Sequence, residues 1–270
     1  MVKPSQKRQV VVHLKTSFKA GLARCCSLVN WSRSNWYYES KKDDSELQEK
    51  LEGLTLKYPT RGFDNYYNRL RNEGYKWSRN RVLRVYRELG LVRRKKKRKK
   101  LPEALRKPIE QPRKLNEIWS MDFMSDSLQD GRALRVLNII DDCNRESLCI
   151  TGTLSFPAER LVRVLDELVE LHGYPKYIRT DNGPEFISKH YQDWCKRMNI
   201  TPVYIEPGKP MQNGYIERFN RTFREDVLDA YMFSSYTDFN RLGQDWRMDY
   251  NAPPHKGLGY KTPKQYALRA

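Results

Sequence analysis

Apolar runs in the second half of the chain predict a sheet of five strands. Residues 118–124 and 134–140 are short apolar segments, and residues 145–151 can return beside them as a third strand. Residues 177–180 and 203–205 are two further runs, each separated from the previous strand by a longer segment. Runs of this length bounded by turn residues are typical of buried strands. We therefore expect three antiparallel strands followed by two more.

Helical spacing fills the segments between and after these later strands. Leu161, Leu165 and Leu168 have helical spacing. Pro157 before them is suited to the start of a helix, and Gly173 after them to its end. Residues 189–198 predict another helix, and residues 213–231 a final one. The apolar stripe of the final helix is Ile216, Phe219, Phe223 and Val227. Strands and helices in this order predict an α/β fold, a mixed five-stranded sheet flanked by helices, which resembles the ribonuclease-H-like arrangement.

The first half of the chain contains helical patterns and no strand pattern. Residues 7–38 read as two or three short helices interrupted at Gly21, which is compatible with a helix-turn-helix. Apolar residues at helical spacing then precede Pro59, Gly74 and Gly90 in turn, and Ser78 is a suitable N-cap for the last of these helices. We therefore expect an all-α region that resembles a helix-turn-helix to precede the α/β fold.

Positive charge is concentrated in this helical half. Residues 1–118 hold 31 basic and 12 acidic side chains, whereas residues 119–270 hold 20 and 21. A basic region joined to a neutral one predicts a module that binds a polyanion such as DNA. The candidate DNA-contacting residues here are Arg79, Arg81 and Arg84 on one helix, and Arg93, Arg94, Lys95 and Lys96 in the basic run that follows. The alternative is a solvated helix face beside a localisation signal.

The same run marks a domain boundary. Pro102, Pro108 and Pro112 follow it and stiffen the chain. We therefore expect a basic helical DNA-binding region at residues 1–92, a basic, proline-containing linker at 93–116, and an α/β catalytic core with a C-terminal helical tail at 117–270.

The composition argues against a membrane protein and against a disulfide framework. No stretch approaches the roughly 18 apolar residues needed to span a bilayer, and no apolar signal-peptide core follows Met1. The five cysteines include no Cys-x-x-Cys pair, and His190 with Cys195 is a weak signal for zinc. We expect a cytosolic protein, or a nuclear one in a eukaryote, with reduced thiols.

Three carboxylates interrupt apolar elements and predict a metal site. Asp122 lies within the first strand, Asp181 follows directly on the fourth, and Glu217 lies one turn into the final helix. Buried carboxylates need a counter-charge, and hard oxygen ligands suit Mg²⁺ or, as a substitute, Mn²⁺. Two such ions would support an in-line phosphodiester displacement. Asp126 and Asp142 are competing acids, which we interpret as surface or neighbouring residues.

Basic and amide side chains accompany the third acid. Arg221 and Arg224 follow Glu217 on the same helix face, where they could meet phosphates; the alternative is that they only pair with Glu217 or Asp226. The remaining candidates for DNA contact around this helix are Lys209, Gln212, Asn213 and Arg218.

Three motifs around these acids resemble a known family. Residues Trp119–Phe123, Arg179–Phe186 and Pro207–Asn220 resemble the retroviral-integrase superfamily, and more narrowly the second-frame transposases of bacterial insertion sequences. The 35 residues between Asp181 and Glu217 match the spacing of that family's Asp-Asp-Glu triad. Residues 61–91 resemble its basic helix-turn-helix segment, and residues 250–263 its tail. The chain departs from the family at Met124, often a threonine, and at Pro253, which replaces an arginine in a motif one residue shorter.

The resemblance implies a DNA transposase that cuts at the ends of a mobile element and joins the freed 3′-hydroxyl to target DNA. It also implies magnesium as cofactor, double-stranded DNA as partner, an oligomer that holds two ends, nucleoid DNA in a bacterial cytoplasm as the location, and normal fusion to a DNA-binding protein from an upstream reading frame. Two alternatives are a catalytically silent DNA-binding protein and a ribonuclease-H-like nuclease that cuts without joining.

Overall fold

The computed structural model describes residues 4–38, 43–92, 111–206 and 210–269, and the chain divides into two compact units at Glu46 and Leu47. The first unit contains the helices α1 (Pro4–Phe18), α2 (Leu22–Leu28) and α3 (Arg33–Tyr37). They pack around Val11, Cys25 and Cys26. The expectation of two or three short helices broken at Gly21 is confirmed, because Gly21 is the N-cap residue of α2.

Three helices, the first of which crosses this boundary, share a small core of their own in the second unit. They are α4 (Ser45–Lys57), α5 (Phe63–Asn72) and α6 (Arg79–Glu88). Ser78 caps α6 as expected, since its Oγ accepts a hydrogen bond from the Arg81 amide. The fully buried side chains of this helical core include Leu47, Leu51, Tyr66, Leu70, Val82 and Val85.

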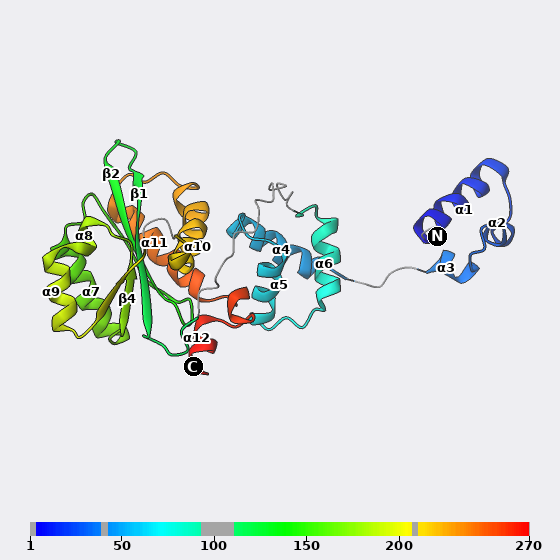
Figure 1. The fold of residues 1–270 in the computed structure, drawn as a ribbon. Coiled ribbons are helices and arrows are strands. Elements are labelled where there is room, and N and C mark those ends of the chain that lie inside the picture. The colour runs from blue at the N-terminus through cyan, green and yellow to red at the C-terminus, as the bar shows by residue number, and fades with distance from the viewer. Residues whose placement is uncertain (1–3, 39–42, 93–110, 207–209, 270) are drawn as a thin grey trace. The chain divides into compact units, whose positions relative to one another are not determined.

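A mixed five-stranded sheet forms the centre of the second unit (Figure 1). Its strands are β1 (Ile118–Ser127), β2 (Ala133–Asp141), β3 (Ser147–Thr153), β4 (Tyr177–Thr180) and β5 (Thr201–Tyr204). They lie in the order β3-β2-β1-β4-β5, with β1 antiparallel to β2 and parallel to β4. This confirms the predicted meander and the mixed sheet, although β3 and β5 each begin two residues away from the predicted positions.

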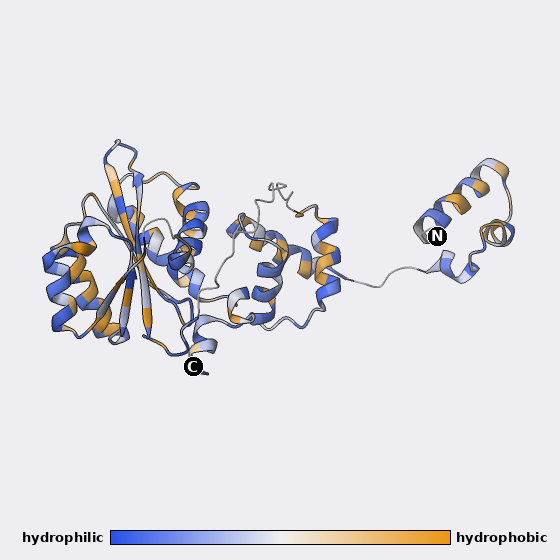
Figure 2. Ribbon diagram, viewed as in Figure 1, coloured by the Kyte–Doolittle hydropathy of each residue, from blue (hydrophilic) through white to orange (hydrophobic). Residues whose placement is uncertain are grey.

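Helices cover both faces of the sheet. On one face, α7 (Ala158–His172), α8 (Pro184–Ile187) and α9 (Lys189–Arg197) pack on Trp119, Met121 and Ile178. On the other, α10 (Gly214–Phe223) and α11 (Tyr236–Asn251) pack on Met124, Val136 and Ile150. Figure 2 shows hydrophobic residues along the strands and along helix faces turned towards the sheet, with hydrophilic residues outside. This is the arrangement expected for a two-sided sheet core.

The final predicted helix is shorter than expected. A π-helical turn, η2 (Arg224–Leu228), replaces the α-helix after Phe223, so the predicted continuous helix to Tyr231 is wrong. Val227 and Leu228 of this turn both lie in the core on the α10 side of the sheet. The second unit also contains three short elements, which are η1 (Pro210–Asn213), η3 (Lys256–Leu258) and α12 (Pro263–Ala267). Within the described ranges, no helix has the length and apolarity required to cross a lipid bilayer.

Candidate active site

Strand register brings Asp122 and Asp181 to the same level of the sheet. Ser120 of β1 pairs with Arg179 of β4 in the parallel ladder. Counting two residues along each strand leads to Asp122 and Asp181. Adjacent strands lie about 4.8 Å apart, and residues of matching register point to the same face. Asp122 lies in β1 and Asp181 directly follows the end of β4, so the two acids come from neighbouring positions at this level of the sheet, and the charge of Asp181 acts on Asp122.

Helix α10 covers that same face and carries Glu217. Asp122 alternates with Met121 and Phe123, whose side chains belong to the opposite core, so it points to the α10 side. The buried stripe Ile216, Phe219 and Phe223 holds the helix on the sheet. Glu217 lies in the first turn of α10, half-buried beside this stripe.

Two asparagines connect the helix to the strands. Asn220 Nδ2 donates a hydrogen bond to Asp122 Oδ2 over 2.8 Å, and Asn138 Nδ2 donates to Asn220 Oδ1 over 2.8 Å. Asn138 is the β2 residue that pairs with Asp122 in the ladder, and both asparagines are buried. Sequence reasoning missed both roles. The available signal was that Asn220 follows Glu217 by three residues, which places them on adjacent parts of one helix face.

The loop after β4 shapes the surroundings of Asp181. The Gly183 amide donates to Asp181 Oδ1 over 3.1 Å, which is the turn geometry expected of an Asp-Asn-Gly sequence. A Cβ atom at Gly183 would lie 3.1 Å from Asp181 Oδ1 and 3.3 Å from Glu185 Oε2, so both oxygens flank the glycine closely. Arg135 neutralises Glu185 through an ion pair of 2.7 Å. Glu185 is thus a paired acid at the edge of the site.

The acids of the site are coupled electrostatically. The pKa of Asp122 is raised to about 6, first by burial and then by the charges of Asp181 and Glu217, against the hydrogen bonds from Phe123 and Asn220. The Glu217 carboxylate makes no hydrogen bond or ion pair with any described residue. In the described ranges, no three His, Cys, Asp or Glu side chains as they stand are grouped closely enough to hold a metal ion.

Comparison with known proteins assigns the chain to a family. Two models described as integrase core domain match residues 112–210 and 198–263, so Asp122 and Asp181 lie in the first match and Glu217 in the second. An uncharacterised 31.7 kDa protein of insertion element IS407 from Burkholderia multivorans is 34% identical over 91% of this chain and 90% of its own length. The chain belongs to the integrase-core transposase family of bacterial insertion elements. It is therefore a DDE-type polynucleotidyl transferase.

More distant similarities complete the comparison of this transposase. The transposase InsD of the IS2 elements from Escherichia coli is 23% identical over 83% of this chain and 79% of its own length. A simian T-cell lymphotropic virus intasome, solved with the B56 gamma regulatory subunit of PP2A, aligns with a TM-score of 0.48 at 18% identity. That alignment covers 82% of this chain and 74% of the other.

The competing acids of the transposase occupy other positions. Asp142 is fully buried and forms an ion pair of 2.7 Å with Arg179, so the expectation of a surface residue is wrong and that of a neighbouring residue remains. The pair fastens the end of β2 to β4, two residues before Asp181. Asp126 is half-buried near the end of β1 and accepts the Ser127 amide. Cys195 is buried, whereas His190 is exposed.

The candidate DNA-contacting residues of the helical region are partly engaged within the protein. Arg79 pairs with Asp64 at 2.7 Å, and Arg84 pairs with Glu88 at 3.0 Å. Arg81 is half-buried. Arg93, Arg94, Lys95 and Lys96, and also Lys209 near the catalytic helix, lie outside the described residues.

The candidates around α10 differ in exposure. Arg218 and Arg221 are exposed, whereas Asn213 is buried and its Oδ1 has no hydrogen-bond partner among the described residues. Gln212 Nε2 donates to Glu206 Oε1, and Arg224 donates to the Ser125 carbonyl. The expected alternative pairing of Arg221 with Glu217 is absent from the described part of the chain, and Asp226 pairs instead with Arg61.

Proposed function

We propose that this transposase hydrolyses phosphodiester bonds at the ends of its mobile element and transfers the freed 3′-hydroxyl to target DNA. Asp122, Asp181 and Glu217 are the catalytic residues and would hold two divalent cations, Mg²⁺ or in its place Mn²⁺. The observation that supports this assignment most strongly is the register: Asp122 in β1 and Asp181 directly after the adjacent parallel strand β4 lie at one level, and Asp122 faces the helix that carries Glu217.

The donor set fits magnesium. Neither Asp122 nor Glu217 has a cationic partner among the described residues, and the pKa of Asp122 is raised by burial and by the charges of the other two acids. Hard oxygen donors in excess of positive charge are the ligands that Mg²⁺ and Mn²⁺ prefer. When bound, such ions would polarise the attacking and leaving oxygens and neutralise the phosphate.

The protein residues around the carboxylates have supporting roles. Asn220 holds Asp122 in position through its hydrogen bond, and Asn138 in turn orients the Asn220 amide. The exposed Arg221, one turn after Glu217, would contact DNA phosphate oxygens.

Because two element ends must be joined in one reaction, the active form is an oligomer on double-stranded DNA. We further propose that a DNA-binding protein from an upstream reading frame is fused to this chain. The transposase then acts on nucleoid DNA in the bacterial cytoplasm.

A cleavage and strand-transfer assay on labelled duplexes that carry the element ends tests the proposal. We expect Asp181→Asn and Glu217→Gln to abolish Mg²⁺-dependent cleavage and joining while DNA binding persists. Asp229→Asn, at an exposed aspartate beyond α10, is the matched control and keeps both activities. Activity in either triad variant contradicts the mechanism. No cleavage by the unaltered protein supports the silent DNA-binding alternative, and cleavage without joining supports a nuclease.

A further inference from the structure

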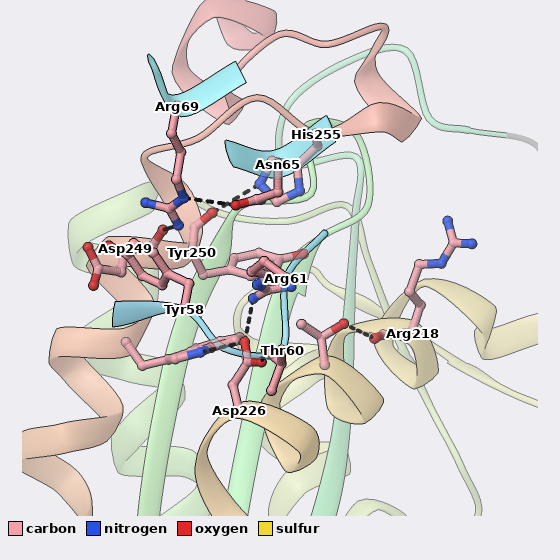
Figure 3. Close-up of polar contacts among 12 residues, drawn as sticks. Tyr58, Thr60, Arg61, Asn65, Arg69, Arg218, Asp226, Asp249, Tyr250 and His255 are labelled. Carbon is pink, nitrogen blue, oxygen red and sulfur yellow. Dashed lines mark hydrogen bonds and ion pairs between the residues drawn. The ribbon is translucent and has the colours of Figure 1, made fainter. Parts of the chain in front are cut away.

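A basic cavity of about 370 Å³ lies beside the catalytic helix and apart from the three carboxylates. Its walls come from α5, from α10, from the turn between β2 and β3, and from the segment after α11. The cations that line it are Arg61, Arg69, Arg145, Arg218 and Lys256. Figure 3 shows Arg61 and Arg69 reaching in from the helical part of the chain. Arg218, on α10, stands apart from the ion pair between Arg61 and Asp226.

The cavity has an excess of positive charge. None of its lining residues is acidic. Arg61 is neutralised by Asp226, but the other four cations have no carboxylate within 4.0 Å in the described part of the chain. Cations gathered around one hollow repel each other, and an anion in that hollow would relieve the repulsion. The charge pattern therefore indicates an anionic ligand.

Arg145 is held in position at the cost of backbone strain. Its φ angle is +61°, a region that residues other than glycine rarely adopt. Its guanidinium lies 3.1 Å from the centroid of the Tyr215 ring, which fixes the direction of the side chain. Its Nη1 atom is buried without a hydrogen-bond partner among the described residues, as is Nε of Arg61. Two buried guanidinium donors at one cavity point to a missing acceptor.

The positive charge of these arginines affects the neighbouring side chain of His255. The pKa of His255 is lowered to about 4, first by burial and then by Arg61, Arg145 and Arg69, against its hydrogen bond to the Tyr250 carbonyl. The cations around the cavity therefore converge on the same small volume.

We propose that this cavity binds a phosphate group of the DNA backbone, at a site separate from the phosphate that is cut. Arginine is the side chain best suited to phosphate oxygens, because its planar donors can bind two oxygens at once. The volume lies within the range of ordinary ligand pockets, so a phosphate and part of its sugar fit. This inference rests on the proposed transposase function.

The site connects two parts of the second unit. Arg61 and Arg69 belong to the loop and helix of the α5 region, whereas Arg218 directly follows Glu217 on α10. A phosphate bound between them contacts the helical part and the catalytic helix together. DNA held there is fixed relative to the catalytic carboxylates, which is a positioning role and not a chemical one.

The test is DNA binding by the full chain in EDTA, measured by fluorescence anisotropy over a range of NaCl concentrations. The variants are Arg145→Gly, which removes the charge and relieves the positive φ, and Arg218→Gln, at an exposed position. Arg163→Gln, an exposed arginine on α7, is the matched control. Each lost phosphate contact lowers the slope of log affinity against log salt by about 0.9.

We expect both cavity variants to lose about one unit of slope and roughly tenfold in affinity, while Arg163→Gln loses neither. The melting temperature of Arg145→Gly should stay close to that of the unaltered protein; if it unfolds, Arg218→Gln carries the test. Slopes equal to that of the control overturn the inference. Inorganic phosphate provides a second arm: if it raises the melting temperature only when Arg145 is present, while the DNA slope is unchanged, the site binds free phosphate and not DNA.

These outcomes separate the cavity from the catalytic proposal. Metal-dependent cleavage by the unaltered protein together with unchanged slopes refutes the cavity and leaves the proposed function standing. Reduced slopes in a protein that never cleaves DNA refute the catalytic proposal, and with it the positioning role of the cavity.

Discussion

Asn220 Nδ2 donates a hydrogen bond of 2.8 Å to Asp122 Oδ2, which links the helix that carries Glu217 to the strand that carries Asp122. A partner of this kind fixes the orientation of a ligand, and its loss typically lowers metal affinity or activity by about 10–100-fold. We therefore expect Asn220→Ala to raise the Mg²⁺ concentration for half-maximal cleavage by that factor.

The control for this variant is Asn240→Ala. Asn240 also makes two side-chain hydrogen bonds, to the backbone of Gly152, but it lies on α11 away from the three acids. Both variants lose stability, yet only Asn220→Ala should shift the Mg²⁺ midpoint. Equal midpoints in the two variants would show that Asn220 has a structural role alone.

Asp226 is the acceptor that joins the α4–α6 helices to the catalytic part. Its carboxylate accepts hydrogen bonds from Thr60, from Arg61 and, at 3.0 Å, from the Trp246 indole. Removing it leaves the largely buried Arg61 without a counter-charge, so we expect Asp226→Ala to lower the free energy of unfolding by about 3 kcal/mol. Urea denaturation measures this. Asp229→Ala, at a 59% exposed side chain 3.9 Å from Arg224, should cost less than about 1 kcal/mol.

Gly152 allows α11 to pack closely on β3. A Cβ atom there would overlap the Phe239 ring, which is fully buried and has little room to move. Gly152→Ala should therefore lower the free energy of unfolding by about 1–3 kcal/mol. Gly53→Ala is the matched comparison, since a Cβ on this exposed α4 residue meets nothing within 4 Å and favours the helix by up to about 1 kcal/mol. Equal effects of the two substitutions would rule out the close approach.

The sequence pattern predicted the layers of the core and singled out the three candidate catalytic acids. Alternation within β1 already separates Asp122 from Met121, and helical spacing in α7 and α9 gives their buried faces. Local patterns do not contain strand pairing, however. The match of Ser120 with Arg179, which brings Asp122 level with Asp181, joins residues far apart in the chain and emerges only in the folded sheet.

The errors have the same origin. The stripe Ile216, Phe219, Phe223 and Val227 continues smoothly through the π turn, so spacing alone extends α10 too far. Arg145 resembles an ordinary turn residue in the sequence. Its role at the cavity depends on Tyr215 and on α5, which no local pattern connects to it.

His255 makes stability depend on pH. Its folded pKa of about 4 lies below the ordinary value of 6.5, so its uncharged ring contributes stability that is present above pH 6.5 and is lost as the pH falls towards 4. Besides Tyr250, the groups that face it are Arg61, Arg69 and Arg145. The contribution is at most about 3 kcal/mol. The melting-temperature difference between the unaltered protein and His255→Gln should therefore shrink between pH 7 and pH 4.5. The exposed His190→Gln is the control, and a constant difference for His255→Gln would contradict this effect.

Anomalous diffraction from crystals soaked in Mn²⁺ tests the central assignment most directly. The account predicts manganese peaks bound by carboxylate oxygens of Asp122, Asp181 and Glu217 at distances of about 2.0–2.3 Å, with the peaks lost in Asp181→Asn crystals. Manganese bound elsewhere, with the three acids left without a shared ion at saturating concentration, would contradict it.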